Sequence, residues 1–219
     1  MSRLETLKIL QELYMYRSFG FTYYKKREIM PQKPNVSIPN SLDELKKNVH
    51  GCFLCALCKT RKNVVFGEGS LHAKIMFIGE GPGACEDTQG RPFVGNAGIL
   101  LTKMIENVLK IKRSDVYIAN IVKCRPPENR TPTPEEANMC RPYVFKQIEI
   151  ISPEVIVALG GTSYRYLTGD ESGITKVRGE ILEYKTAKLI PTFHPSYLLR
   201  NESAKKDAYH DMLKVKALL

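Results

Sequence analysis

The sequence "AKIMFIGEGPG" (residues 73–83) joins an apolar run to a loop that places Glu80 among three glycines and a proline. A short run that is apolar on both faces is typical of a strand buried in a parallel sheet. The loop after it has three explanations: a phosphate cradle, a tight turn, or backbone brought close to a flat ligand with a carboxylate aimed at it. A phosphate cradle is the least convincing, because the Lys-Ser/Thr ending of a P-loop is missing and a glutamate would repel a phosphate.

Three further apolar, β-branched runs predict strands at 115–122, 153–160 and 188–193. Helical patterns accompany them at 96–110, 134–151, 161–168 and 204–218. Strands that alternate with helices predict a parallel sheet covered on both faces.

Polar residues of three separate segments fall at the carboxyl ends of these predicted strands. They are the loop 79–83, Asn120, and "FHPSYLLR" at 193–200. Because ligands of open parallel sheets bind at this edge, we expect the three segments to form one site.

Helix starts are marked in three places. Ser2 with Glu5 and Ser41 with Glu44 have the spacing of a capping box, and Thr133 stands before a proline as the expected N-cap of the helix at 134–151.

Residues 1–40 are predicted to form an N-terminal part, with a helix at 2–18 and then a basic, tyrosine-rich arm broken by prolines. Residues 41–219 form the main domain. The aromatic rings of the arm could stack bases, but aromatics beside cations more often anchor an arm onto its own domain. The sequence leaves open whether the arm contacts a replication clamp.

Composition limits the class of protein. The 219 residues are 43% apolar and 26% charged, which is typical of a globular protein, and no apolar run is long enough to cross a bilayer. The N-terminus does not resemble a secretory signal, so an intracellular, cytoplasmic protein without a membrane contact is expected. The formal charge of +10 favours a polyanionic partner but does not prove one.

The cysteines have the spacing of metal ligands. Cys52 and Cys55 form a C-x2-C pair, and Cys124 and Cys140 lie far downstream, so the four could complete a thiolate site for zinc or an iron–sulfur cluster. Cys58 makes a second C-x2-C pair with Cys55, which leaves the choice of pair open. Unrelated buried cysteines are the alternative, because free cysteine is often buried.

Six motifs of this chain occur in the same order and at similar spacing in one known family. They are "VVFGEG", "GEGPG", "EDTQGRPFVGNAG", "IANIVKCRPPENRTP", "ITKVRG" and "FHPSYLLRN". Over residues 50–219 the chain resembles the family 4 (iron–sulfur) uracil-DNA glycosylases. The resemblance implies a three-layer α/β/α sandwich with a central four-stranded parallel sheet, behind an N-terminal helical extension. It also implies a [4Fe–4S] cluster on Cys52, Cys55, Cys124 and Cys140.

The resemblance implies roles for the residues of the expected site. Glu80 would orient water and stabilise the sugar, and His194 would bond to uracil O2 as negative charge grows there. The substrate-binding residues would be Gly79, Gly81, Pro82, Gly83, Phe93 and Asn120. The residues in contact with DNA would be Ser163, Ser196, Tyr197 and Arg200. The alternatives are core packing for Phe93, a turn cap for Asn120 and a structural role for His194.

The expected activity is that of a monofunctional uracil-DNA glycosylase, a hydrolase of base excision repair. It would act as a monomer on single- or double-stranded DNA, leave an abasic site, and lie at the nucleoid when bound. The loop 127–136 contains no histidine, so turnover is expected rather than covalent trapping. Cys85 departs from the acidic residue common in the family, without an expected loss of activity. The alternatives are a catalytically inactive iron–sulfur nucleic-acid-binding protein and an electron-transfer protein.

Overall fold

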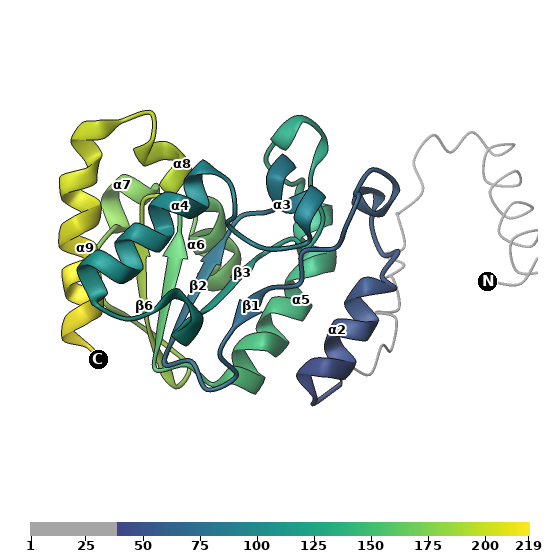
Figure 1. Cartoon of the computed structure of the whole chain (residues 1–219), viewed down its shortest axis with the longest axis horizontal. Coiled ribbons are helices and arrows are strands. Elements are labelled where there is room, and N and C mark those ends of the chain that lie inside the picture. Colours follow the sequence, from purple (N-terminus) through teal and green to yellow (C-terminus); the bar gives the residue numbers. More distant parts are fainter. Residues whose placement is uncertain (1–38) are drawn as a thin grey trace, which may run out of the picture. The chain divides into compact units, whose positions relative to one another are not determined.

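The computed structural model describes residues 39–219 and has a mixed six-stranded sheet at its centre, in the order β1-β3-β2-β4-β6-β5 (Figure 1). The strands are β1 (Glu68–Gly69), β2 (Ile75–Gly79), β3 (Tyr117–Asn120), β4 (Val155–Leu159), β5 (Leu182–Tyr184) and β6 (Ala187–Thr192).

The four inner strands are the four predicted strands, and they run parallel. β2 pairs with β3 and β4, and β4 pairs with β6. The prediction of a purely parallel, four-stranded sheet was incomplete, because β1 and β5 add an antiparallel strand at each edge. These edge strands have two and three residues, which is too short for an alternating pattern to be visible in the sequence.

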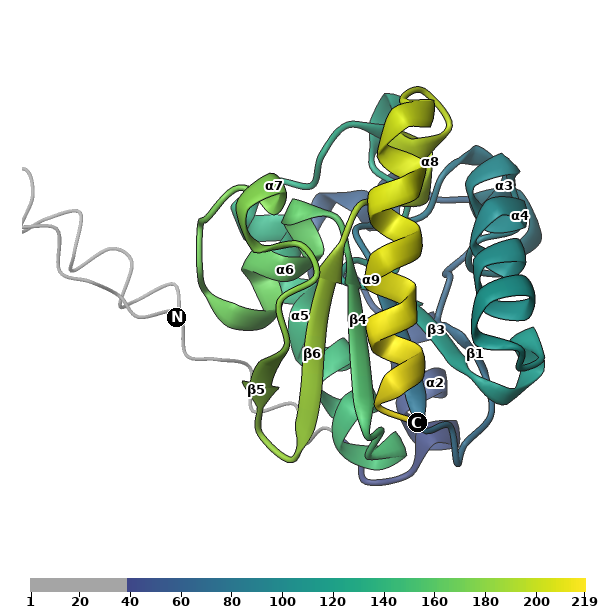
Figure 2. The ribbon, with the colours of Figure 1, turned by 90° about the vertical axis from the view of Figure 1, so that its left-hand side faces the viewer.

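Helices cover both faces of the sheet, as the sequence predicted (Figure 2). The α-helices are α2 (Leu42–His50), α3 (Ala84–Gln89), α4 (Asn96–Lys103), α5 (Pro134–Ile151), α6 (Gly161–Thr168), α7 (Ile174–Val177), α8 (Pro195–Leu198) and α9 (Lys205–Ala217). The other helical segments are η1 (Ala56–Lys59), η2 (Met104–Leu109), η3 (Arg113–Asp115), η4 (Pro127–Asn129) and η5 (Glu202–Ala204).

Alternate residues of each inner strand pack into two separate hydrophobic cores. Met76 and Ile78 of β2 face the core that contains residues of α2, α5 and α6. Ile75 and Phe77 face the core that contains residues of α4, η2 and α9. Burial on both faces is the reason why these strands are continuously apolar.

Two of the predicted helix starts lie in the described region. At α5 the Thr133 hydroxyl accepts the N–H of Glu136 at 3.2 Å, and the Glu136 carboxylate accepts the N–H of Thr133 at 2.9 Å, so this N-cap is confirmed. α2 begins directly after Ser41, but the Ser41 side chain makes no capping hydrogen bond. The Ser41 capping box was therefore wrong, although the start of the helix was correct.

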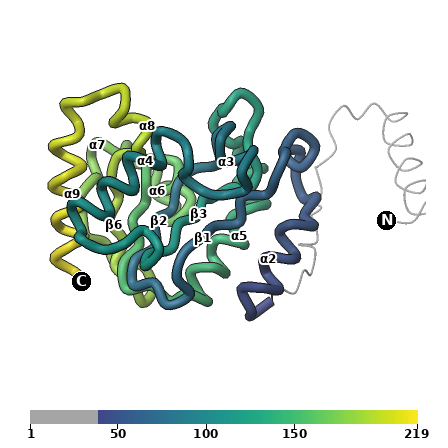
Figure 3. The backbone as a smooth tube through the Cα atoms, viewed as in Figure 1, coloured from purple at the N-terminus to yellow at the C-terminus, as the bar shows by residue number. Residues whose placement is uncertain are grey.

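The helix predicted at 96–110 is divided into α4 and the π-helical turn η2, which ends where Lys110 adopts a φ of 63°. α2 lies against α5 although the two are far apart in the sequence, as the backbone trace shows (Figure 3).

The helix predicted at 2–18 and the arm that follows it lie outside the described residues. The boundary at residue 40 therefore stays a prediction. Within residues 39–219, no helix combines the length and the apolar character that a membrane crossing requires.

Candidate active site

A cavity of about 540 Å³ lies at the carboxyl ends of the parallel strands. The loops after β2, β3, β4 and β6 all contribute to its wall. β3 and β4 lie on opposite sides of β2 in the sheet. The chain therefore passes from β2 to the neighbour on one side and then crosses to the neighbour on the other side. Such a reversal is where ligands bind in open α/β sheets. The predicted residues that line the cavity are Glu80, Gly81, Pro82, Gly83, Phe93, Asn120, His194, Ser196, Tyr197 and Arg200.

Gly79 and Gly81 are required because neighbouring side chains occupy the space of a Cβ. A Cβ on Gly79 would lie 2.5 Å from Oδ1 of Asn120 and 2.6 Å from Cζ of Phe93. A Cβ on Gly81 would lie 2.7 Å from a methyl group of Val122. Gly79 does not line the cavity itself, but its missing side chain lets Asn120 and Phe93 approach the end of β2.

Glu80 is half-buried and lines the cavity. Its main-chain oxygen accepts the N–H of Val122 at 3.1 Å, and that of Gly79 accepts the N–H of Ile121 at 2.9 Å. These bonds extend the pairing of β2 with β3 beyond the strands and fix the loop. Within residues 39–219 the Glu80 carboxylate has no hydrogen bond or ion pair, so both of its oxygens are available to a ligand or water.

Asn120 ends β3 and is 1% exposed. Its main-chain oxygen accepts a hydrogen bond from Nζ of Lys123 at 2.9 Å. Its side-chain Oδ1 is buried and has no hydrogen-bond partner in the described part of the chain. A buried amide oxygen without a partner is costly, so this atom indicates that a ligand completes the site.

Phe93 is buried beside this amide, and its ring centroid lies 5.7 Å from that of His194. Its φ is 52°, in the left-handed region that a bulky residue rarely adopts. Strain of this kind is commonly found at functional sites and persists only where surrounding contacts hold it.

His194 follows β6, and Nδ1 of its ring accepts the N–H of Ser196 at 3.1 Å. The Ser196 hydroxyl lies 2.8 Å from the same nitrogen. The pKa of His194 is lowered to about 4, mainly by burial and also by the positive charge of Arg200, while the Glu86 carboxylate acts in the opposite direction. The ring is therefore neutral at pH 7, and because Nδ1 accepts, its proton resides on Nε2.

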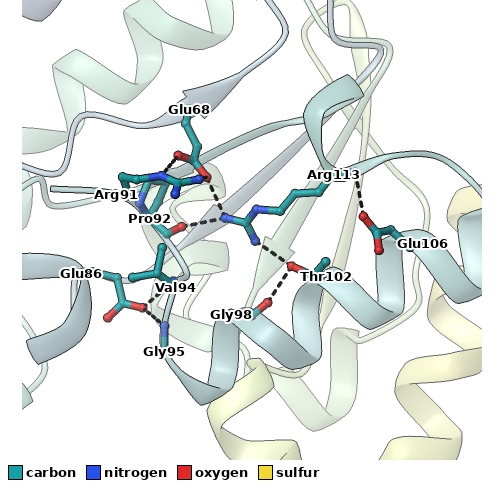
Figure 4. A network of polar contacts seen from close by, with 10 residues as sticks. All are labelled: Glu68, Glu86, Arg91, Pro92, Val94, Gly95, Gly98, Thr102, Glu106 and Arg113. Carbon is teal, nitrogen blue, oxygen red and sulfur yellow. Dashed lines mark hydrogen bonds and ion pairs between the residues drawn. The ribbon is translucent and has the colours of Figure 1, made fainter. Parts of the chain in front are cut away.

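Glu86 also lines the cavity, and the sequence analysis assigned it no role. Its Oε1 accepts the N–H groups of Val94 and Gly95, both at 2.9 Å (Figure 4). Its Oε2 accepts the N–H of Gly83 at 3.2 Å. This carboxylate joins the glycine loop to the loop that carries Phe93. A glutamate three residues after Gly83, at the N3 position of a short helix, was the signal that could have revealed it.

The mouth of the cavity includes Ser196, Tyr197 and Arg200, but not Ser163. Ser163 is fully buried, and its hydroxyl donates to the main-chain oxygen of Gly160 at 2.9 Å. The structure therefore gives no support to a DNA contact through the Ser163 side chain. The wall also contains residues that the sequence analysis did not assign: Ala97, Pro126, Asn129, Arg130, Thr131, Leu159, Gly160 and Gly161.

Residues 66–214 match the family described as the Uracil DNA glycosylase superfamily. A type-4 uracil-DNA glycosylase of Thermotoga maritima is 54% identical over 164 residues, which are 74% of this chain and 85% of that protein. The chain belongs to the type-4 uracil-DNA glycosylase family. Type-4 uracil-DNA glycosylases of Sulfurisphaera tokodaii and Saccharolobus solfataricus are each 46% identical over 82% of this chain, and the match covers 85% and 87% of those proteins.

This member of the type-4 family has a second, small and apolar cavity beside α2 and α5. Five of the six cysteines line it, namely Cys52, Cys55, Cys58, Cys124 and Cys140. The sulfur of Cys124 accepts from Nη1 of Arg61 at 3.2 Å, and that of Cys140 accepts from the main-chain N–H of Lys123 at 3.3 Å. The sixth, Cys85, is exposed elsewhere.

The four predicted cysteine ligands are therefore brought together, although they come from distant parts of the sequence. Within residues 39–219, no group of three or more His, Cys, Asp or Glu side chains is placed to hold a metal ion. That finding concerns ligands that meet around one ion. In a four-iron cluster each of the four cysteines binds a different iron, so the sulfur atoms need not converge on one point. Cys58 lies in the same cavity, so the choice between Cys52 and Cys58 as partner of Cys55 stays open.

Proposed function

We propose that this protein removes uracil from DNA by hydrolysing the N-glycosidic bond and leaves an abasic site. The observation that carries the proposal is the buried, unpartnered Oδ1 of Asn120 at a cavity that also contains Phe93, His194 and Glu80. The names of the type-4 relatives support the same activity.

Asn120 is the proposed reader of the base. Its Oδ1 would accept the N3–H of uracil, and its Nδ2 would donate to uracil O4. Cytosine presents an acceptor at N3 and a donor at position 4, so both contacts would fail with cytosine. The pairing of β3 with β2 and the bond from Lys123 hold the main chain of Asn120 in place before a base arrives.

Phe93 is the proposed stacking surface. A base in a duplex is stacked and paired, so an enzyme that acts on its glycosidic bond must first flip the nucleotide out. Stacking on an aromatic ring offsets part of that cost, by about 1–3 kcal/mol per base.

His194 is the proposed stabiliser of the departing base. Negative charge develops on uracil as the bond breaks, and a fixed hydrogen-bond donor stabilises that charge most effectively in a site from which water is excluded. Neutral His194 has such a donor in Nε2–H, because Nδ1 is engaged by Ser196.

Glu80 is the proposed partner of the sugar and the attacking water. Its carboxylate is an anion without other partners in residues 39–219, at the cavity wall where positive charge on the sugar would need compensation. Ser196, Tyr197 and Arg200 at the mouth are the proposed contacts to the DNA, with Arg200 able to pair with a phosphate.

The strand should not be cut by the protein itself. Within the described residues no lysine lines the cavity, so no amine is placed to form a Schiff base with the sugar. Lys123 does lie in one of the family motifs, and burial lowers its pKa to about 7. Its amine, however, is fully buried and bound to Asn120 and Gln147.

We also propose a [4Fe–4S] cluster on Cys52, Cys55, Cys124 and Cys140. The residues fit such a group, because four thiols surround one apolar cavity and two of their sulfurs already accept N–H bonds. A bound cluster would supply a covalent link between the segment after α2 and the loop after β3. The monomeric state and a clamp contact through residues 1–40 remain proposals without support from the described region.

The proposal is tested by incubating the protein with single- and double-stranded oligonucleotides that carry one uracil, followed by alkaline cleavage of abasic sites. Glu80→Gln should slow cleavage and leave DNA affinity almost unchanged, since the amide keeps the shape and loses the charge. An oligonucleotide with cytosine in place of uracil is the control. Family membership does not favour a catalytically inactive DNA-binding protein. Uracil strands that stay intact after incubation with the wild-type protein would nevertheless support that alternative and contradict the proposal.

A further inference from the structure

The stacking ring of Phe93 stands on a strained main chain. Its φ of 52° costs free energy in a non-glycine residue, so neighbouring contacts must hold this conformation. The two residues after it are held by Glu86, whose Oε1 accepts the N–H groups of Val94 and Gly95. Pro92, the residue before Phe93, is held by contacts from a different segment of the chain.

Arg113 provides those contacts directly. Its Nη2 donates to the main-chain oxygen of Pro92 at 2.7 Å and to Glu68 at 3.0 Å (Figure 4). The side chain is 18% exposed and lies in a pair with Glu68, so its position is well defined. Arg113 belongs to η3, just before β3, and none of the family motifs quoted above includes it.

Arg113 also supports the loop indirectly. Its Nη1 donates to Oγ1 of Thr102 at 3.0 Å, and that hydroxyl donates to the main-chain oxygen of Gly98 at 3.0 Å. Gly98 lies directly against Phe93, because a Cβ on Gly98 would lie 1.8 Å from the Phe93 main-chain oxygen. One guanidinium therefore fixes the main chain before Phe93 and the helix turn packed against it.

We propose that Arg113 is a positioning residue for the flipped base: by holding the carbonyl of Pro92 and the turn at Gly98, it keeps the Phe93 ring in stacking position. Arg113 does not line the cavity, so its effect on a base would be indirect, and Phe93 is the aromatic lining residue that its contacts support. This inference rests on the proposed function, in which Phe93 stacks on uracil. It predicts that Arg113 sets the affinity for uracil without taking part in bond cleavage.

The test compares Arg113→Ala and Arg113→Lys with Arg91→Ala as a matched control. Arg91 also pairs with Glu68, at 2.8 Å, but makes no bond to the Pro92 carbonyl. Free uracil is the probe, and its binding is measured by calorimetry below the melting temperature of every variant. Arg113→Ala should weaken uracil binding about tenfold, because loss of one base–aromatic stack corresponds to about fivefold to 150-fold. KM should rise similarly with kcat nearly unchanged, since stacking is equal in ground and transition states.

Arg91→Ala should bind uracil as the wild type does, and Arg113→Lys should recover part of the affinity through one bond to Pro92. In a Phe93→Ala background, Arg113→Ala should cause no further loss, because its effect passes through the ring. Unchanged uracil binding in Arg113→Ala, or an equal loss with and without the Phe93 ring, overturns the proposal.

A wild-type protein that binds uracil but does not excise it refutes the proposed function and leaves the role of Arg113 measurable. A wild-type protein that excises uracil, with an Arg113→Ala variant whose uracil affinity and KM are both unchanged, refutes the role of Arg113 and leaves the proposed function standing.

Discussion

His194 should remain neutral when the pH is lowered from 7 to 5.5. Burial is the main cause, Arg200 adds to it, and the pKa falls from the usual 6.5 to about 4. At pH 5.5 an ordinary histidine would be about 90% protonated, whereas one with this pKa would be about 3% protonated. The Nε2–H donor should therefore be present with the same strength throughout this range.

The size of the effect on stability follows from the same shift. The lowering of the His194 pKa from 6.5 to about 4 corresponds to about 3 kcal/mol of folding free energy, at 1.36 kcal/mol per pKa unit. The unfolded chain binds this proton below pH 6.5 and the folded chain does not, so the folded state loses stability as the pH falls from 6.5 toward 4. Above pH 6.5 the contribution to the pH dependence disappears, because His194 is neutral in both states.

The assay is an NMR titration of the histidine Cε1–H signals between pH 7 and 5, with His194→Asn used to assign the signal. A second measurement follows uracil release over the same range. Replacing Arg200 by Gln should raise the pKa of His194, and replacing Glu86 by Gln should lower it, in accordance with the signs of their charges. A midpoint above pH 6 for His194 would refute the argument from burial and the charge of Arg200.

Three further predictions concern the two cavities. Gly79→Ala should lower kcat/KM for uracil release about fivefold or more, because its Cβ would overlap the side chains of Asn120 and Phe93, and overpacking costs about 1–3 kcal/mol. Gly173→Ala is the control, since its Cβ meets only a threonine oxygen at 3.9 Å. Equal rates in both variants would show that the cavity wall adjusts to the extra methyl group at Gly79. Asn120→Asp should reduce uracil release by roughly tenfold to a hundredfold, as an unmatched polar contact costs about 1–3 kcal/mol, and an unchanged rate would exclude the amide as reader. Cys124→Ser and Cys52→Ser should each abolish the visible absorption of the proposed cluster and lower the melting temperature, whereas Cys58→Ser should preserve both. Loss of the absorption in Cys58→Ser but not in Cys52→Ser would assign Cys58 as the ligand in place of Cys52.

Much of the fold could be predicted because its signals are local. The inner strands are apolar on both faces, so their runs are visible without knowledge of their neighbours, and α5 is marked by Thr133 and the proline after it. The edge strands β1 and β5 have no such signal, because two or three residues acquire strand geometry only from the partner they pair with.

The candidate site was predictable where a residue stands at a strand end. Asn120 ends β3 and His194 follows β6, so the parallel topology alone places both at one edge of the sheet. Ser163 was predicted to contact DNA because it lies near a helix start, and that contact stays a prediction; the burial of its side chain comes from tertiary packing and has no signal in the sequence. Glu86 and Arg113 act through main-chain groups of another loop, and no sequence pattern identifies the carbonyl or N–H that they meet.

The amino-acid sequence alone determined the order of the four inner strands along the chain, the helices between them and the residues at the strand ends, since each depends on a pattern within a short segment. The type-4 family was indicated by six such motifs in the same order along residues 50–219. The tertiary structure decided the unpartnered oxygen of Asn120, the low pKa of His194 and the strained platform under Phe93. Each of these arises from burial and contact between segments that are distant along the chain, and burial is a property of the packed molecule rather than of any segment.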